Sequence, residues 1–100
     1  MDKRNVLDIA RALRIFFQSE DWVMAEILIG DCDGANTVFG TEFKFDPKVI
    51  WVYLDGQRMI PTIDYVVSES GGVGTGYDTV TFTFAPLEHD NIIADYCKAD

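Results

Sequence analysis

Residues 49–67 read VIWVYLDGQRMIPTIDYVV, and residues 78–96 read DTVTFTFAPLEHDNIIADY. Both stretches are rich in β-branched and aromatic residues, and much of their length alternates in the manner of β-strands. Asp55-Gly56 separates two apolar runs in the first stretch. A type I′ hairpin turn requires a positive φ at both central residues, which Asp tolerates and Gly adopts freely. This region therefore predicts a chain that is mainly β.

The neighbouring segments extend the β pattern. Residues 37–45 and 79–84 alternate, and residues 91–97 form the closing strand. Residues 49–54 are apolar on both faces, which indicates a central strand covered on both sides or a strand in an interface. We expect a β-sandwich or a small Greek-key barrel of about six strands. Its predicted inward residues are Phe39, Phe43, Phe45, Ile50, Val52, Leu54, Val80, Phe82, Phe84 and Ile92.

The N-terminal segment has a different pattern. Residues 5–18 have the period of an amphipathic helix, so we expect an N-terminal amphipathic helix there. Its apolar face comprises Val6, Ile9, Ala10, Leu13, Phe16 and Phe17, and its opposite face carries Arg4, Arg11 and Arg14 with Leu7 and Ile15. Two interpretations remain open. The helix packs on its own β-domain with its arginines in water, or its basic face meets a neighbouring subunit.

Residues 19–29 are ambiguous between helix and strand. Ser19-Glu20-Asp21 is a good helix start, because a hydroxyl caps free amides and acids favour the positive helix end. Against that, Val23, Ala25, Ile27 and Ile29 alternate like a half-buried strand. We favour a short second helix or a helix-to-strand transition. The expected organisation is thus a helical arm over residues 1–30 and a β-domain over residues 31–100.

Composition restricts the classes of function. One hundred residues make one domain, which can bury roughly 60–65% of its unfolded surface. The net charge of −9 argues against binding to nucleic acid, whose phosphates are recognised by Lys and Arg. No apolar run approaches the roughly 18–20 residues of a membrane span, and the N-terminus lacks the apolar core of a secretion signal. We therefore expect synthesis in the cytoplasm, no membrane partner, and thiols rather than a disulfide at Cys32 and Cys97.

Two segments invite a ligand interpretation. Asp31, Asp33 and Glu42 match calcium-loop positions, but Ala35 replaces an oxygen ligand and the glycine is misplaced, so a solvated β-turn is favoured over an EF-hand site, and a looser surface calcium site stays open as an alternative. The glycines of residues 71–76 resemble a phosphate loop, but a strand follows them where a helix is needed. We expect a flexible hairpin loop there, free to order against a partner, and no cofactor.

Catalytic chemistry is not indicated either. His89 is the only histidine, and no orienting group or oxyanion loop accompanies either cysteine in the sequence. We predict no catalytic, cofactor-binding or metal-binding residues and no enzymatic activity.

The order of elements resembles a small β-sandwich module of tailed-phage virion proteins, found in tail fibres, collars, necks and baseplates. The resemblance covers about residues 35–97. It rests on the apolar strand, Asp55-Gly56, Asp64-Tyr65, the Thr/Phe strand, Ala85-Pro86 and the closing strand that ends at Asp95-Tyr96. Glu88-His89-Asp90 stands where that family usually has a glycine and an Asp. The resemblance implies a non-enzymatic structural subunit of a virion, made in the host cytoplasm, whose partners are other virion proteins.

Three classes of function remain in competition. The first is the virion subunit, expected to be a homo-oligomer. Its partner-contact candidates are Arg4, Leu7, Arg11, Arg14, Ile15, Gly72, Gly74 and Gly76. The second is a carbohydrate- or ligand-binding module, which requires a solvent-facing aromatic platform at Trp51 or Tyr53. The third is an uncharacterised domain or enzyme component.

Overall fold

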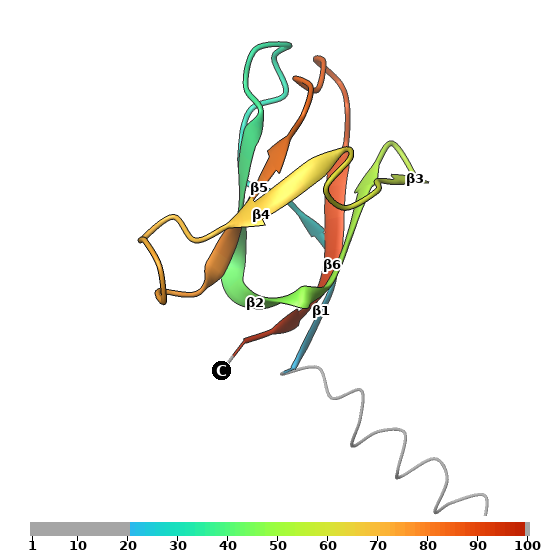
Figure 1. The fold of residues 1–100 in the computed structure, drawn as a ribbon. Coiled ribbons are helices and arrows are strands. Elements are labelled where there is room, and N and C mark those ends of the chain that lie inside the picture. Colours follow the sequence, from blue (N-terminus) through green and yellow to red (C-terminus); the bar gives the residue numbers. More distant parts are fainter. Residues whose placement is uncertain (1–20, 100) are drawn as a thin grey trace, which may run out of the picture.

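The computed structural model describes residues 21–99, and within them the chain forms an antiparallel sheet of six strands and no helix (Figure 1). The prediction of a mainly β chain is confirmed, whereas the helix expected over residues 5–18 lies outside the described residues. Along the sheet the order is β1-β6-β2-β5-β4, and β3 pairs with β2. The strands are β1 (Trp22–Ile27), β2 (Val38–Leu54), β3 (Gln57–Arg58), β4 (Tyr65–Ser68), β5 (Tyr77–Phe82) and β6 (Ile92–Lys98).

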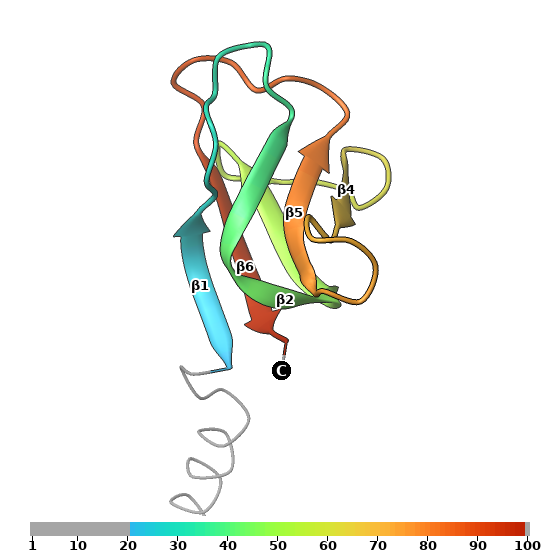
Figure 2. The same cartoon turned by 90° about the vertical axis from the view of Figure 1, so that its left-hand side faces the viewer.

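The long strand β2 organises the fold. Its first part pairs with β5, with Phe39 opposite Val80, and its last part pairs with β6, with Val52 opposite Ala94. The register shifts on both sides of Phe45, and Figures 1 and 2 show β2 bending there. The two halves of the sheet therefore lie on either side of one core. That core contains Leu28, Phe39, Phe45, Ile50, Val52, Tyr65, Val80, Phe82, Ile92, Ala94 and Tyr96.

The prediction of which residues face inward is mostly confirmed. Seven of the ten are buried in the core, and Leu54 packs against it. The prediction is wrong for Phe43 and Phe84, which are exposed. Phe43 is 40% exposed because the irregularity in β2 turns it outward, where Lys98 Nζ lies 4.2 Å from the centre of its ring. Phe84 is 38% exposed because β5 ends at Phe82, whose ring centroid is 5.4 Å away from that of Phe84.

Of the two interpretations favoured for residues 19–29, the short second helix is wrong over Trp22–Ile27, which is strand β1. The start of a helix-to-strand transition at residues 19–20 lies outside the described residues. Strand β1 pairs with β6 and so belongs to the sheet, although it precedes the domain boundary expected at residue 31. A bulge lies between Val23 and Glu26 and contains Ala25, whose φ is 54°. The Ala25 N–H donates a 2.6 Å hydrogen bond to Asp95 Oδ1, which holds the bulge in place.

The hairpin turn predicted at Asp55-Gly56 is confirmed. Both residues have a positive φ, 51° and 85°, as a type I′ turn requires. The turn is also fastened to the chain before β6. Asp55 N–H donates to the Asn91 carbonyl at 2.9 Å, and Asn91 N–H donates to Asp55 Oδ1 at 2.8 Å. These bonds fix the β2–β3 hairpin against the start of β6.

Candidate functional site

Strands β1 and β6 and the last part of β2 present one face to the core and the other outward. On the inner side, Val52 pairs with Ala94. On the outer side, Trp51 lies opposite Asp95, and Tyr53 lies opposite Ile93. Strand β1 extends the same surface, because Trp22 and Ile27 pair with Cys97 and Ile93 of β6. We call this surface the outer face; it comprises Trp22, Met24, Ile27, Trp51, Tyr53, Ile93, Asp95 and Cys97.

Two tryptophans form the centre of the outer face. The rings of Trp22 and Trp51 are nearly parallel, with an interplanar angle of 12° and centroids 6.2 Å apart. With Met24 and Asp95 they line a shallow pocket of about 430 Å³. Met24 is 66% exposed, and Ile27, farther along β1, is 78% exposed. Large apolar side chains gathered on one exposed sheet face are typical of a surface that contacts another molecule.

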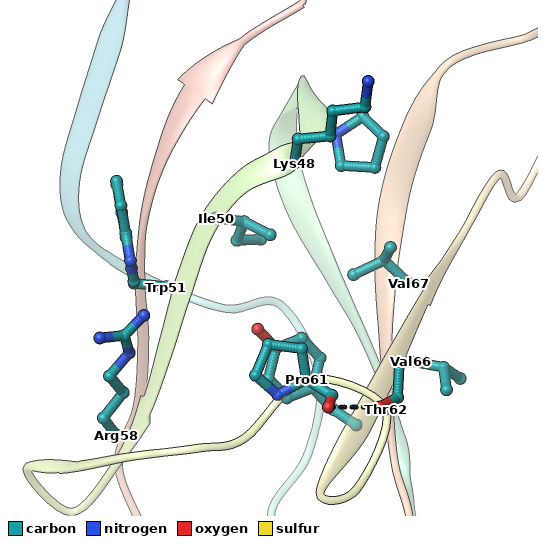
Figure 3. A pocket seen from close by; sticks show the side chains of 10 residues that line it. Lys48, Ile50, Trp51, Arg58, Pro61, Thr62, Val66 and Val67 are labelled. Carbon is teal, nitrogen blue, oxygen red and sulfur yellow. Dashed lines mark hydrogen bonds between the residues drawn. The ribbon is translucent and has the colours of Figure 1, made fainter.

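Charged groups surround this apolar centre. The Arg58 guanidinium points toward the Trp51 indole (Figure 3). Asp21 and Asp46 line a hollow beside Trp22 together with Lys98, and Asp55 lines another hollow beside Ile27. Trp, Tyr and Arg are the residue types that contribute most to binding energy at protein interfaces. The outer face therefore has an aromatic centre with one arginine and a mainly acidic border.

The glycine-rich loop joins β4 and β5, on the far side of the strand order from β1 (Figure 1). Gly72, Gly74 and Gly76 all have a positive φ, between 87° and 103°. Glu69 Oε2 accepts the N–H groups of Gly74 and Gly76 at 2.9 and 2.8 Å. The amides that a phosphate loop would direct at a bound anion thus contact a carboxylate of the chain itself.

Asp78 anchors the other end of the same loop. Its carboxylate accepts hydrogen bonds from Lys44 Nζ at 2.8 Å, from Ser70 N–H at 2.9 Å and from Ser70 Oγ at 2.6 Å. The Lys44 ammonium, followed by the Ser70 donors, holds the pKa of Asp78 far below its usual range. The loop that we expected to be flexible is therefore tied to its own hairpin by two carboxylates.

The segment considered as a calcium loop is a turn held by its own side chains. Asp33 Oδ1 accepts the N–H groups of Asn36 and Ala35 at 2.8 and 2.9 Å, and these bonds lower the pKa of Asp33. The Asn36 amide in turn donates to the carbonyls of Asp31 and Val38. Within residues 21–99, no three or more His, Cys, Asp and Glu side chains form a group that could hold a metal ion.

The remaining titratable candidates are His89 and the two cysteines. The His89 side chain is almost fully exposed, with Nε2 3.7 Å from the Glu88 carboxylate. Burial, and then the charge of Asp90, raises the pKa of the Cys32 thiol. A thiol with a raised pKa stays protonated at neutral pH, and the protonated form is the poor nucleophile. Both cysteines are thiols in the structure.

The sequence located only part of the outer face. It singled out Trp51 and Tyr53, whose strand is apolar on both sides. It missed Trp22, Met24 and Ile27, because a helix was favoured there, although the alternation of residues 23–29 was a signal for the strand. The arm candidates Arg4, Leu7, Arg11, Arg14 and Ile15 lie outside the described residues. Gly72, Gly74 and Gly76 lie in the β4–β5 loop, which belongs to a different part of the sheet from the outer face.

Comparison with known proteins finds no matching family model, no similar curated protein and no similar solved structure. Residues 21–99 contain no helix that is long and apolar enough to span a membrane.

Proposed function

We propose that this chain is a non-enzymatic structural component of a tailed-phage virion, a neck, tail or head-surface subunit that acts through subunit–subunit interfaces. It is made in the host cytoplasm and ends in the virion. The observation that carries the interface proposal is the outer face, where stacked Trp22 and Trp51 lie beside exposed Met24 and Ile27. The exposed side chains of Met24 and Ile27 are costly to leave in water, and a partner that covers them gains the corresponding hydrophobic free energy.

The virion setting rests on the resemblance in the order of elements. Residues of three of its motifs have structural roles that support it. Tyr65 and Pro86 are buried, and Asp55-Gly56 forms the expected turn. His89, which stands in the segment where the family usually has a glycine, has a φ of 73°. This is a conformation that glycine adopts without strain, so the chain keeps a glycine-like backbone with a different residue.

We further propose that the sheet is a small Greek-key barrel rather than a β-sandwich. Ile29 and Gly40 exchange two backbone hydrogen bonds of 2.8 Å. Gly40 also pairs with Thr79 of β5, so the first half of β2 has a neighbour on each side. Together with the bend in β2, this bridge connects the β1–β6 side of the sheet to the β5 side.

The partner contacts that we propose bring together the N-terminal arm of one copy and the body of another. Arg4, Arg11 and Arg14 supply positive charge, and Leu7 and Ile15 supply apolar contact area. The acidic border of the outer face, formed by Asp21, Asp46 and Asp55, is complementary in charge to the arm. Complementary charges set the register of an interface, while apolar residues supply most of its affinity. A head-to-tail contact of this kind can be satisfied by every subunit of a closed ring.

Sedimentation velocity of the full chain tests this proposal. The wild type should form oligomers whose fraction rises with concentration. Changing Arg4, Arg11 and Arg14 together to Glu should leave monomers with an unchanged β-type circular dichroism spectrum. The matched control changes the same three residues to Lys, which keeps the charge and should keep the oligomers. Normal assembly of the Glu variant would contradict the role of the arm.

A second candidate function is a carbohydrate- or ligand-binding module. The parallel rings of Trp22 and Trp51 favour it, because sugar rings stack on flat aromatic surfaces, and the Asp95 carboxylate lies in the same hollow. A glycan screen read out by tryptophan fluorescence separates the two functions. Saturable quenching that is lost in Trp51→Ala would favour the binding module.

A further inference from the structure

Another hollow lies between the last part of β2 and β4 (Figure 3). Its volume is about 460 Å³, within the range of roughly 300–1,000 Å³ that is common for small-molecule pockets. Ile50, Pro61 and Val67 form apolar walls, and β4 is the last strand of the sheet on this side. Such a pocket can enclose the apolar part of a ligand.

Tyr65 supplies a hydrogen-bonding group to this pocket. The residue is only 2% exposed, and its ring packs edge-to-face on Phe82 with centroids 6.3 Å apart. Its hydroxyl has no hydrogen-bond partner within residues 21–99. Every fully buried side-chain oxygen in these residues does have a partner, so the Tyr65 hydroxyl is not fully buried. The hydroxyl therefore reaches the pocket that Tyr65 lines. The described residues supply no partner for this hydroxyl, so it is available to a molecule in the pocket, whether water or a ligand.

Tyr96, in the same core, provides the contrast. Its hydroxyl donates to Glu26 Oε1 at 2.7 Å and accepts the Phe43 N–H at 3.3 Å. Both capacities of that hydroxyl are used inside the protein. The hydroxyl of Tyr65, unlike that of Tyr96, is therefore left available to a molecule in the pocket.

The charge around the pocket is positive, although the chain has a net charge of −9. Arg58 and Lys48 line it, and no Asp or Glu does so among the described residues. The Arg58 charge acts on Tyr65: burial raises the pKa of the phenol, and the guanidinium opposes that rise. In Figure 3 the Lys48 ammonium points away from the apolar walls, which places it at the rim. An anionic group is thus favoured at the Arg58 side of the pocket.

We propose that this pocket binds an apolar group that carries a carboxylate, with the Tyr65 hydroxyl and the Arg58 guanidinium as its hydrogen-bond donors. Guanidinium–carboxylate hydrogen bonds are charge-assisted and are stronger than neutral ones. The apolar walls take up the rest of the ligand. The pocket adjoins the outer face, because Trp51 lines it and Arg58 borders both, but its ligand chemistry does not depend on the proposed virion role. The carboxylate can come from a small organic acid or from the C-terminus of a peptide.

The test is a titration of the isotope-labelled full chain, followed by amide chemical shifts of Ile50, Tyr65 and Val67. The probe is 4-phenylbutyrate, and its matched control is 4-phenylbutanol, which has the same apolar body without the charge. We expect saturable shifts with the acid and at least about tenfold weaker binding of the alcohol. Equal binding of the two compounds, or no saturable shift with the acid, would overturn the proposal.

Two variants identify the donors. Tyr65→Phe removes the hydroxyl and Arg58→Gln removes the charged guanidinium, and each should weaken binding of the acid by about tenfold. Lys98→Gln removes a base outside the pocket and should bind like the wild type. Wild-type affinity in Tyr65→Phe would overturn the assigned donor. A peptide C-terminus is tested with N-acetyl-Phe-Leu, as the free acid and as the amide. If the free acid of this dipeptide binds more tightly than 4-phenylbutyrate, the source of the carboxylate is a peptide C-terminus.

Discussion

The Tyr96 hydroxyl donates a 2.7 Å hydrogen bond to the Glu26 carboxylate, linking β6 to β1 beneath the outer face. The same hydroxyl accepts the Phe43 N–H, so it also holds the irregular part of β2. Burial, followed by the hydrogen bond to Glu26, raises the pKa of Tyr96 well above its usual value and keeps the hydroxyl protonated as a donor. One buried side chain thus connects the three strands that carry the outer face.

The first prediction compares the two core tyrosines. Tyr96→Phe leaves the Glu26 carboxylate and the Phe43 amide without that partner, and it should lower the free energy of unfolding by about 1–3 kcal/mol. Tyr65→Phe removes a hydroxyl with no partner among the described residues and should change stability by less than about 0.5 kcal/mol. Urea denaturation measures both variants. A similar effect of the two substitutions would contradict the assigned hydrogen bonds.

A second prediction concerns acid and the glycine-rich loop. Because the pKa of Asp78 is lowered in the folded state, its contribution to stability is present above the ordinary carboxylate pKa of about 4 and is lost as the pH falls below that value. Asp78→Asn should therefore destabilise the protein at pH 7 and flatten the loss of stability between pH 5 and about 2. The measurement is urea denaturation across this range. If variant and wild type had parallel pH profiles, the Lys44–Asp78 pair would not contribute.

A third prediction concerns backbone strain before β6. His89 has a φ of 73°, in a turn closed by the 2.8 Å bond from Leu87 N–H to Asp90 Oδ2. A left-handed conformation costs a non-glycine residue about 1–2 kcal/mol, and glycine loses about 1 kcal/mol through greater freedom in the unfolded chain. His89→Gly should therefore be neutral or stabilising by up to about 1 kcal/mol.

The matched control for His89→Gly is Glu88→Gly in the same turn. Glu88 does not have a positive φ, so glycine there gives only the entropic loss and should destabilise the protein. Thermal unfolding monitored by circular dichroism measures the two variants. A His89→Gly variant that is less stable than Glu88→Gly would show that the left-handed turn is not strained.

The sequence predicted correctly those elements whose conformation depends on neighbouring residues in the chain. Asp55-Gly56 specifies its own turn, and Val80 and Phe82 specify the buried side of β5 by simple alternation. The strand β1 could not be derived in this way, because its Ser19-Glu20-Asp21 lead resembles a helix cap. The pairing of Trp22–Ile27 with β6, more than sixty residues away in sequence, decides the strand instead.

The sequence did not predict the outer face for a related reason. The bulge at Ala25 moves Glu26 to the inner side and leaves Ile27 outside. This breaks the simple alternation that the sequence of residues 23–29 suggests. Phe43 was misplaced by the irregularity of β2 in the same manner. A bulge is stabilised by tertiary contacts such as the bond from Ala25 to Asp95, so the sequence pattern alone does not show it.

The central claim is that the outer face is a subunit interface, and Met24→Glu tests it most directly. Met24 is 66% exposed, so a charge there should not affect folding, but it would be buried in an interface at a cost of several kcal/mol. Leu87→Glu is the matched control, since Leu87 is 64% exposed on the loop before β6 and lies outside the outer face. We predict that sedimentation velocity finds concentration-dependent oligomers for the wild type and for Leu87→Glu, and monomers for Met24→Glu. A wild type that stays monomeric at high concentration, or a Met24→Glu variant that assembles like the wild type, would contradict the account.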